Sequence, residues 1–154
     1  MDFYSFDTPL GCMALAAEDG AIVRLYLPNS PIPRLMSHPT PLLAEGARQV
    51  LDYLAGRRQV FDLPLAPQGT PFQQKVWAAL RAIPYGQVCS YKDLARAAGC
   101  PRGFQAVGQA NRRNPIPILI PCHRVIAADG TLGGYAGGLD LKQALLTIEG
   151  ISLL

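Results

Sequence analysis

The sequence has too few metal-binding side chains at suitable spacing for a structural zinc site. There is no C-x-x-C pair, and His38 and His123 are the two histidines. Structural zinc sites use four Cys or His ligands, which usually come in closely spaced pairs. We therefore expect no metal and no cofactor, and, without signs of export, no disulfide. The four cysteines are Cys12, Cys89, Cys100 and Cys122.

The sequence also lacks long apolar segments. No apolar run approaches the roughly 20 residues that a membrane-spanning helix needs. The first residues, Met1-Asp2-Phe3-Tyr4, have neither the basic flank nor the apolar core of a signal peptide. We therefore expect a soluble cytoplasmic protein that does not bind membranes.

Length and charge suggest two parts with different partners. The chain has 154 residues, of which 49% are apolar, enough for one domain or two small ones. Residues 1–69 hold five basic and seven acidic side chains, a charge of −2, whereas residues 70–154 hold nine and four, a charge of +5. A basic half favours a polyanionic partner such as nucleic acid.

Residues 1–66 are predicted to form a small α/β domain with an antiparallel sheet. Short apolar segments alternate with turn residues, and Thr40 can cap a helix that has Pro41 at its first position and ends at Gly56. Nothing in this part has a catalytic pattern. The predicted strands are 3–6, 12–17, 22–27 and 59–63.

Residues 67–154 are predicted to form a second, mainly helical domain. Thr70 and Gln73 make a capping box, and Trp77 belongs to the apolar face of the helix that follows. A helix over 91–98, capped by Ser90, and a second over 102–113 are joined by a turn with Gly99. This is a helix-turn-helix pattern, in which we expect the second helix to approach DNA. The alternative is an ordinary helical hairpin with a polar outer face. The predicted inner face of the second helix is Phe104, Val107 and Ala110.

A proline-stiffened apolar run over 114–125 delivers Cys122 with His123 directly after it. Proline fixes φ and favours extended neighbours, so we expect a stiff extended segment. A nucleophile gains from such stiffness, and a neighbouring base raises the thiolate fraction of a cysteine. The alternative is a buried cysteine in a strand, the usual fate of a free thiol.

In sequence order, these motifs closely resemble the methylated-DNA–protein-cysteine methyltransferases, also called O6-alkylguanine-DNA alkyltransferases. The resemblance covers most of residues 70–154, and the Pro-Cys-His-Arg-Val core is highly specific. The matching residues are Phe72-Gln73, Val76-Trp77, Ile83-Pro84-Tyr85-Gly86, Ser90-Tyr91, Ala106-Val107-Gly108, Asn114-Pro115, Ile120-Pro121-Cys122-His123-Arg124-Val125, Gly133, Tyr135, Gly137-Gly138 and Glu149.

The resemblance implies an α+β fold: a small N-terminal α/β domain and a helical, winged-helix-like C-terminal domain with the helix-turn-helix. It implies direct repair of duplex DNA, in which the alkyl group of a flipped O6-alkylguanine moves once and irreversibly to the protein. O4-alkylthymine is a second candidate substrate. The expected protein is a monomer, associated with the nucleoid if the source is bacterial.

The resemblance also implies roles for individual residues. Cys122 would be the nucleophile, His123 the base, Glu149 the residue that orients it, Tyr91 the donor to the guanine ring, and Asn114 a brace through hydrogen bonds, including to the neighbourhood of Glu149. Residues expected to line the substrate pocket are Val125, Tyr135, Ala136, Pro117 and Gly133. Residues expected to contact DNA are Gln105, Arg102, Ser90, Gln109, Asn111, Arg112, Arg113 and Ala106.

Two positions depart from the family pattern. Gln105 stands where the family usually has an arginine that fills the gap left by the flipped base, so we expect a weaker hold on the extruded state. Ala136 stands where some relatives have serine. Alanine lacks the hydroxyl group of serine, so we expect Ala136 to favour bulkier alkyl groups. The metal ligands that some relatives carry in the N-terminal domain are not evident.

Three other functions are compatible with parts of the pattern. A non-catalytic alkylated-DNA-binding protein would lack the cysteine, which Cys122 argues against. A winged-helix regulator would not need Cys122, His123 and Glu149 together. A cysteine hydrolase would require local patterns that are absent here.

Overall fold

The computed structural model describes residues 1–152, which form two compact units. The first comprises residues 1–68 and 115–119, and the second comprises residues 69–114 and 120 onward. The fold is α+β, as the sequence predicts. The predicted domain ranges, 1–66 and 67–154, differ from the units in one main respect, because residues 115–119 belong to the first unit.

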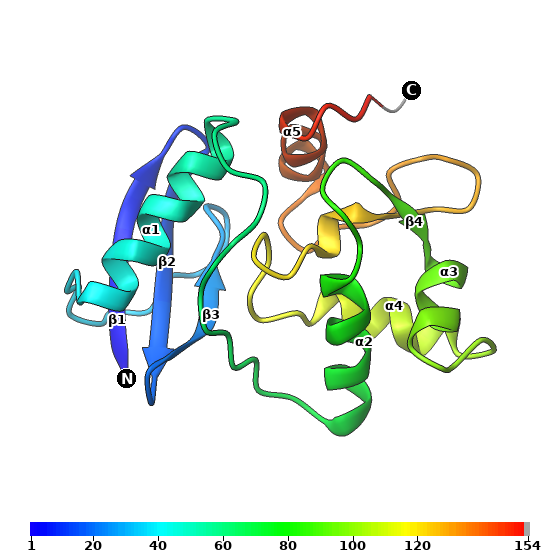
Figure 1. The fold of residues 1–154 in the computed structure, drawn as a ribbon, viewed down its shortest axis with the longest axis horizontal. Coiled ribbons are helices and arrows are strands. Elements are labelled where there is room, and N and C mark those ends of the chain that lie inside the picture. Colours follow the sequence, from blue (N-terminus) through cyan, green and yellow to red (C-terminus); the bar gives the residue numbers. More distant parts are fainter. Residues whose placement is uncertain (153–154) are drawn as a thin grey trace. The chain divides into compact units, whose positions relative to one another are not determined.

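An antiparallel three-stranded sheet forms the first unit (Figure 1). Its strands are β1 (Asp2–Thr8), β2 (Gly11–Glu18) and β3 (Ala21–Tyr26), in the order β1-β2-β3. The turn between β2 and β3 has positive φ at both Asp19 and Gly20, the twist that tight hairpins prefer.

Helix α1 (Pro41–Leu54) lies across this sheet, and Thr40 caps it by accepting a hydrogen bond from the Leu43 amide. The helix approaches the strands closely at Gly46, where a Cβ atom would come within 2.8 Å of the Leu15 side chain. A larger residue would force the ends of the Leu15 and Ile22 side chains to shift.

The strand predicted over 59–63 does not form. The chain instead makes an isolated parallel bridge between Ile22 and Leu65. The side chain of Gln49, on α1, accepts a hydrogen bond from the Asp62 amide at 2.9 Å and donates one to its carbonyl at 3.2 Å. These bonds satisfy backbone groups that a strand partner would otherwise pair.

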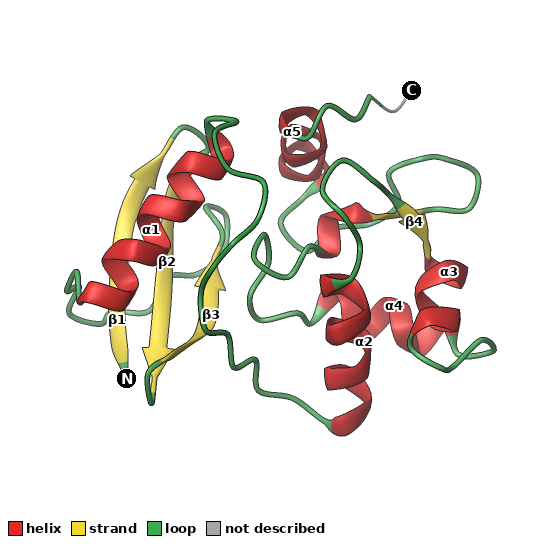
Figure 2. Cartoon of the chain, viewed as in Figure 1, coloured by secondary structure: helices red, strands yellow, loops and turns green. Residues whose placement is uncertain are grey.

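Helices make up most of the regular structure in the second unit (Figure 2). The predicted capping box of Thr70 is present before α2, and the predicted cap Ser90 forms a capping box with Asp93 before α3. Trp77 is buried and donates from Nε1 to the carbonyl of Ala110 at 2.9 Å, which fastens α2 to α4. The elements are α2 (Pro71–Arg81), β4 (Cys89–Ser90), α3 (Tyr91–Ala97), α4 (Phe104–Arg112), the 3-10 helix η1 (Cys122–Arg124), β5 (Val125–Ile126) and α5 (Leu139–Ile148).

The predicted pair of helices is formed by α3 and α4, which pack against each other and against α2. The predicted inner face of α4 is correct for Val107 and Ala110 and wrong for Phe104, whose side chain is exposed. Phe104 is the first residue of α4. Helical side chains tilt toward the N-terminus, so its ring projects beyond the packed turn.

A short parallel ladder links the helix-turn-helix to the cysteine segment. Cys89 pairs with Val125, and Ser90 pairs with Ile126. Tyr91, the next residue after β4, is thereby held beside the strand that follows Cys122. In residues 1–152 we find no helix with the length and hydropathy needed to cross a bilayer.

Candidate active site

Cys122 lies on a turn and not in an extended strand. The expectation of a single extended segment over 114–125 is wrong, because η1 begins at Cys122 and the Arg124 amide donates to the Pro121 carbonyl at 3.1 Å. The fixed φ of proline suits a turn as well as a strand. The stiffness is still present, but it positions the cysteine at a bend.

The thiol of Cys122 is buried, with 5% of the residue exposed. Burial raises its pKa, because a thiolate loses solvation in the interior. Hydrogen bonds from Asn114 and Tyr135 and the positive charge of Lys142 oppose this rise without cancelling it. The resting state at neutral pH is therefore the thiol, and a base must accept its proton before attack.

His123 can act as that base. Burial lowers the pKa of its imidazole more than Glu149 raises it, so the ring is neutral at neutral pH. Its Nε2 atom lies 2.7 Å from a carboxylate oxygen of Glu149. A carboxylate accepts from Nε2–H, which leaves Nδ1 in the unprotonated form that can take up a proton.

Glu149 is held as a buried carboxylate at the C-terminal end of α5. The guanidinium of Arg124 donates to both of its oxygens, at 2.9 and 3.1 Å, and the Gly86 amide donates to one of them at 3.0 Å. Arg124 also donates to the Ile83 carbonyl at 2.7 Å and lies over the ring of Tyr85. This two-pronged pairing fixes the carboxylate that orients His123.

Asn114 braces the entry to the catalytic turn. Its side-chain amide donates to the carbonyl of Ile120 at 2.8 Å, and its side chain also bonds to the Cys122 thiol and lowers the pKa there. The residue thus contacts both the backbone before Pro121 and the reactive sulfur.

Lys142 is a fully buried cation on α5. Its ammonium group donates to three backbone carbonyls: Val125 at 2.6 Å, Leu132 at 2.5 Å and Gly134 at 3.1 Å. Burial lowers its pKa to about 8, against the raising effect of Cys122. The lysine therefore ties the glycine-rich loop, residues 133–138, to β5. It also places positive charge near the thiol.

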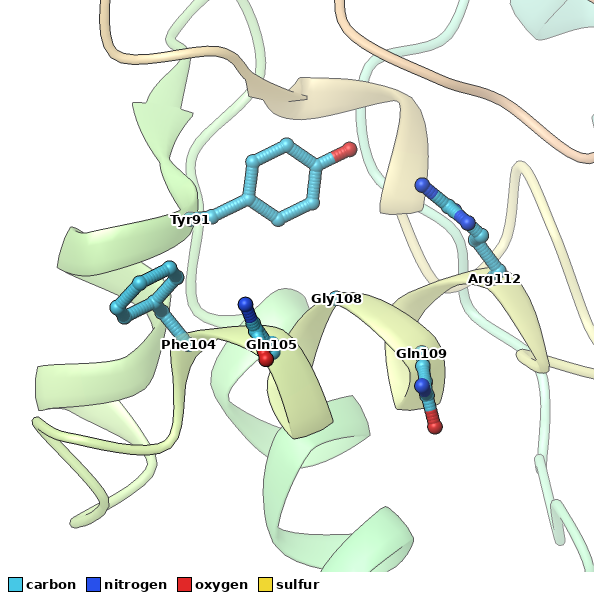
Figure 3. Close-up of a pocket in the computed structure, with 6 residues that line it drawn as sticks. All are labelled: Tyr91, Phe104, Gln105, Gly108, Gln109 and Arg112. Carbon is cyan, nitrogen blue, oxygen red and sulfur yellow. The ribbon is translucent and has the colours of Figure 1, made fainter.

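Tyr91 lies beside an open cavity of about 340 Å³ that α4 helps to line. Burial raises the pKa of its phenol, which stays protonated, and the O–H has no acceptor among the described residues. Gly133 packs on this ring, since a Cβ atom there would lie 3.4 Å from it. The side chains of Tyr91, Phe104, Gln105 and Arg112 border the same space (Figure 3).

The expected DNA-contacting residues fall into four groups. Gln105, Gln109 and Arg112 line the cavity, and Ser90 is half-buried at the start of α3. Asn111 is 3% exposed, so the polar outer face of α4 does not include it. The exposed members outside the cavity are Arg102, Ala106 and Arg113.

The expected pocket residues are also dispersed. Val125 is buried in β5, whereas Tyr135 is half-buried and Ala136 is exposed in the glycine-rich loop. Gly133, in the same loop, contacts Tyr91. Pro117 is buried in the segment 115–119, which belongs to the first compact unit.

Sequence reasoning did not assign a role to Arg124, Gly86 or Lys142. Arg124 and Gly86 stood inside matching motifs, and their place in those motifs was the signal that could have identified them. The sequence contained no signal for the role of Lys142, because a lysine in an amphipathic helix is normally solvent-exposed. Among residues 1–152, no group of three or more His, Cys, Asp and Glu side chains could hold a metal ion.

The comparisons with known proteins all indicate the same family. Residues 71–151 match the family described as 6-O-methylguanine DNA methyltransferase, DNA binding domain. The constitutive methylated-DNA–protein-cysteine methyltransferase of Bacillus subtilis is 47% identical, over 99% of this chain and 98% of its own length. A similarly named Methanosarcina barkeri protein is 46% identical over 93% of each chain. A crystal structure of Mycobacterium tuberculosis OGT in complex with DNA has a TM-score of 0.89 at 39% identity, covering 97% of this chain and 92% of that one.

Proposed function

This chain belongs to the methylated-DNA–protein-cysteine methyltransferase family, and we propose that Cys122 is the residue that accepts the alkyl group. The protein is a DNA-repair methyltransferase, and DNA is its partner. The proposal concerns the atoms that carry out the reaction. Its strongest support is the buried hydrogen bond between Glu149 and His123, the residue that directly follows Cys122 in the sequence.

The proposed first step activates the thiol. The proton of Cys122 moves to Nδ1 of His123 through one water molecule. Glu149 stabilises the imidazolium that forms, and Arg124 keeps Glu149 ionised and oriented. The low dielectric around these groups strengthens their interactions.

The proposed second step transfers the alkyl group. The thiolate attacks the carbon on O6 of guanine in line, so that a C–S bond forms as the C–O6 bond breaks. Guanine leaves as an anion unless it is protonated, and in this proposal the Tyr91 phenol donates that proton. The imidazolium then restores the phenol, so the thiol proton ends on guanine. The thioether is stable to water, and each molecule acts once.

Recognition of the alkylated base is assigned to backbone groups. The carbonyls of Cys122 and Val125 would accept hydrogen bonds from the exocyclic amine of guanine. The loop around Gly133, Tyr135 and Ala136 would line the pocket. Pro117 belongs to the other compact unit and is left out of this assignment. Such a base lies inside the duplex, so it must be flipped out to reach the thiol.

Binding of the duplex is assigned to α4 and the residues near it. The exposed Arg102, Arg112 and Arg113 provide positive charge for phosphates, and Gln105, Ala106, Gln109 and Ser90 provide close contacts. Asn111 is buried and instead packs within the unit. We propose that the protein acts as a monomer, because Cys122, His123, Glu149 and Tyr91 come from one unit of one chain.

A single-turnover assay tests this proposal. The probe is a duplex with one labelled O6-methylguanine, followed by the intact mass of the protein and peptide mapping. We expect one methyl group on Cys122, in stoichiometric yield, and none in Cys122→Ser. Cys100→Ser is the matched control and should react like the wild type. A second duplex with O4-methylthymine tests the wider substrate range.

Tight binding of the lesion without any gain of mass would contradict the proposal and favour a non-catalytic DNA-binding role. Methylation of another cysteine would retain the activity and refute the assignment of Cys122.

A further inference from the structure

Phe104 combines an apolar ring with an exposed position on the DNA-facing helix. It is 43% exposed, and in the described part of the second unit the one other exposed large apolar side chain is Leu139. An exposed aromatic group costs hydration free energy, and a surface helix normally turns such a residue inward. Val107 and Ala110 follow that rule on the same helix.

The ring borders the same cavity as Tyr91, the residue proposed to donate its proton to guanine. Phe104 and Gln105 project from the first turn of α4 on the side of Tyr91, whereas the end of Gln109 points the other way (Figure 3). Arg112 lines the same cavity, and α4 has no acidic residue. The surroundings of the ring are therefore polar and positive, which suits DNA and not an apolar protein partner.

Flipping a base leaves a gap in the stack that must be stabilised. Proteins that distort duplexes often insert an apolar side chain between bases, and stacking on an aromatic ring is favourable for every base. Gln105, the residue at the position of the usual arginine, is short and uncharged. It can bond to the orphaned base but has no ring and little apolar surface.

We propose that Phe104 stacks in the gap left by the flipped nucleotide and supplies the stabilisation that Gln105 cannot. Gln105 then bonds to the unpaired base, and Phe104 covers the faces of the bases next to the gap. This inference rests on the proposed repair function and adds a stacking residue to it. This stacking occurs only with a duplex substrate, and it leaves the chemical step at Cys122 unchanged.

Three substrates separate this role from a general effect on the site. We would measure single-turnover alkylation of Cys122 by a duplex with O6-methylguanine, by the same lesion in a single strand, and by free O6-benzylguanine. Phe104→Ala should slow the duplex reaction about tenfold, the effect of losing one base–aromatic stack. The free base should react at the wild-type rate, because it leaves no gap.

Matched variants define the physical cause. Phe104→Trp should keep the duplex rate, since it keeps a stacking ring, and Phe104→Leu should fall between the wild type and Phe104→Ala. Val60→Ala removes part of an exposed apolar side chain in the other unit and should have no effect. Thermal unfolding should change little for Phe104→Ala, because the ring is largely outside the core.

A double-mutant cycle tests the link to Gln105. In the Gln105→Arg background, Phe104→Ala should cost clearly less than in the wild type, because the longer side chain fills part of the gap. Equal duplex rates for wild type and Phe104→Ala would overturn the inference. So would an equal slowing on the free base, which would assign the ring to the fold of the site. If the wild type alkylates Cys122 with none of the substrates, the proposed function itself fails.

Discussion

The ammonium group of Lys142 donates a 2.6 Å hydrogen bond to the carbonyl of Val125, the same carbonyl proposed to accept from guanine. A carbonyl has two lone pairs, so both bonds can exist together. One buried cation thus orients a recognition group and also lowers the pKa of the nearby Cys122 thiol. The pocket and the nucleophile therefore depend on one side chain in α5.

Replacing this lysine should slow alkyl transfer in a pH-dependent way. Lys142→Met keeps the length but removes the charge, so we expect about a tenfold lower rate with free O6-benzylguanine at pH 7. The wild-type ammonium loses its proton as pH rises through about 8. The ratio of wild-type to variant rates should therefore be largest below pH 8 and shrink above it. A ratio that does not vary with pH would indicate a purely structural role.

Removal of the base should change the pH profile of the reaction. The Cys122 pKa is raised above its ordinary value of 9.0, and the His123 pKa is lowered from 6.5. Wild type should react at a constant rate between the lowered histidine pKa and about pH 8, where Lys142 begins to lose its proton, and more slowly below the histidine pKa. In His123→Gln the thiol must ionise unaided, so the rate should rise about tenfold per pH unit to beyond pH 9. A flat profile in the variant would exclude His123 as the base.

Neutralising Glu149 should reduce both activity and stability. Glu149→Gln no longer stabilises the imidazolium, and we expect at least a hundredfold loss of rate, roughly as for other histidine–carboxylate pairs. Arg124 is then buried without a counter-ion, which costs about 3 kcal/mol in the free energy of unfolding. Urea unfolding and single-turnover kinetics would measure the two effects. Asp140→Asn, on the exposed start of α5, is the control and should change neither strongly.

Restoring the usual arginine should strengthen the hold on the extruded base. Gln105→Arg adds a longer, charged side chain at the rim of the cavity, so we expect tighter binding of lesion duplexes and faster repair. The dependence of affinity on salt should also steepen, by about one counter-ion if the arginine contacts a phosphate. Unchanged affinity and rate would show that Gln105 does not weaken the hold on the extruded base.

Position 136 should affect the choice of alkyl group. Ala136 is exposed in the glycine-rich loop, and a serine there adds a hydroxyl group at the proposed pocket. Ala136→Ser should therefore lower the rate for benzyl adducts relative to methyl adducts, by a few-fold at most. Competition between the two adducts in one reaction measures the preference directly. Identical preferences in the two proteins would remove this residue from the account of specificity.

Local signals were predicted well from the sequence. The capping boxes at Thr70 and Ser90 depend on side chains three residues apart, so the sequence is sufficient to find them. Trp77 was correctly assigned to the core by helical periodicity. The joint role of His123 and Glu149 came from resemblance alone, because no local rule connects residues 26 apart in the chain.

Three of the failures have a common physical cause. Periodicity placed Phe104 inside, but it does not reveal where the neighbouring helix stops covering α4. A β-like pattern over 59–63 did not reveal that Gln49 would satisfy the backbone of Asp62. Lys142 was overlooked since its three carbonyl partners come from segments that no pattern positions. Each error concerns a contact between segments distant in the sequence.

The burial of Cys122 has a consequence for the working life of the protein. In the proposed reaction each molecule acts once, so it must keep its sulfur intact until it meets damage. Oxidants react with exposed thiolates far faster than with buried neutral thiols. We therefore expect the 5% exposure of this residue and its raised pKa to protect it from peroxide during that wait. The same shielding that makes a base necessary for attack thus preserves the stock of active protein.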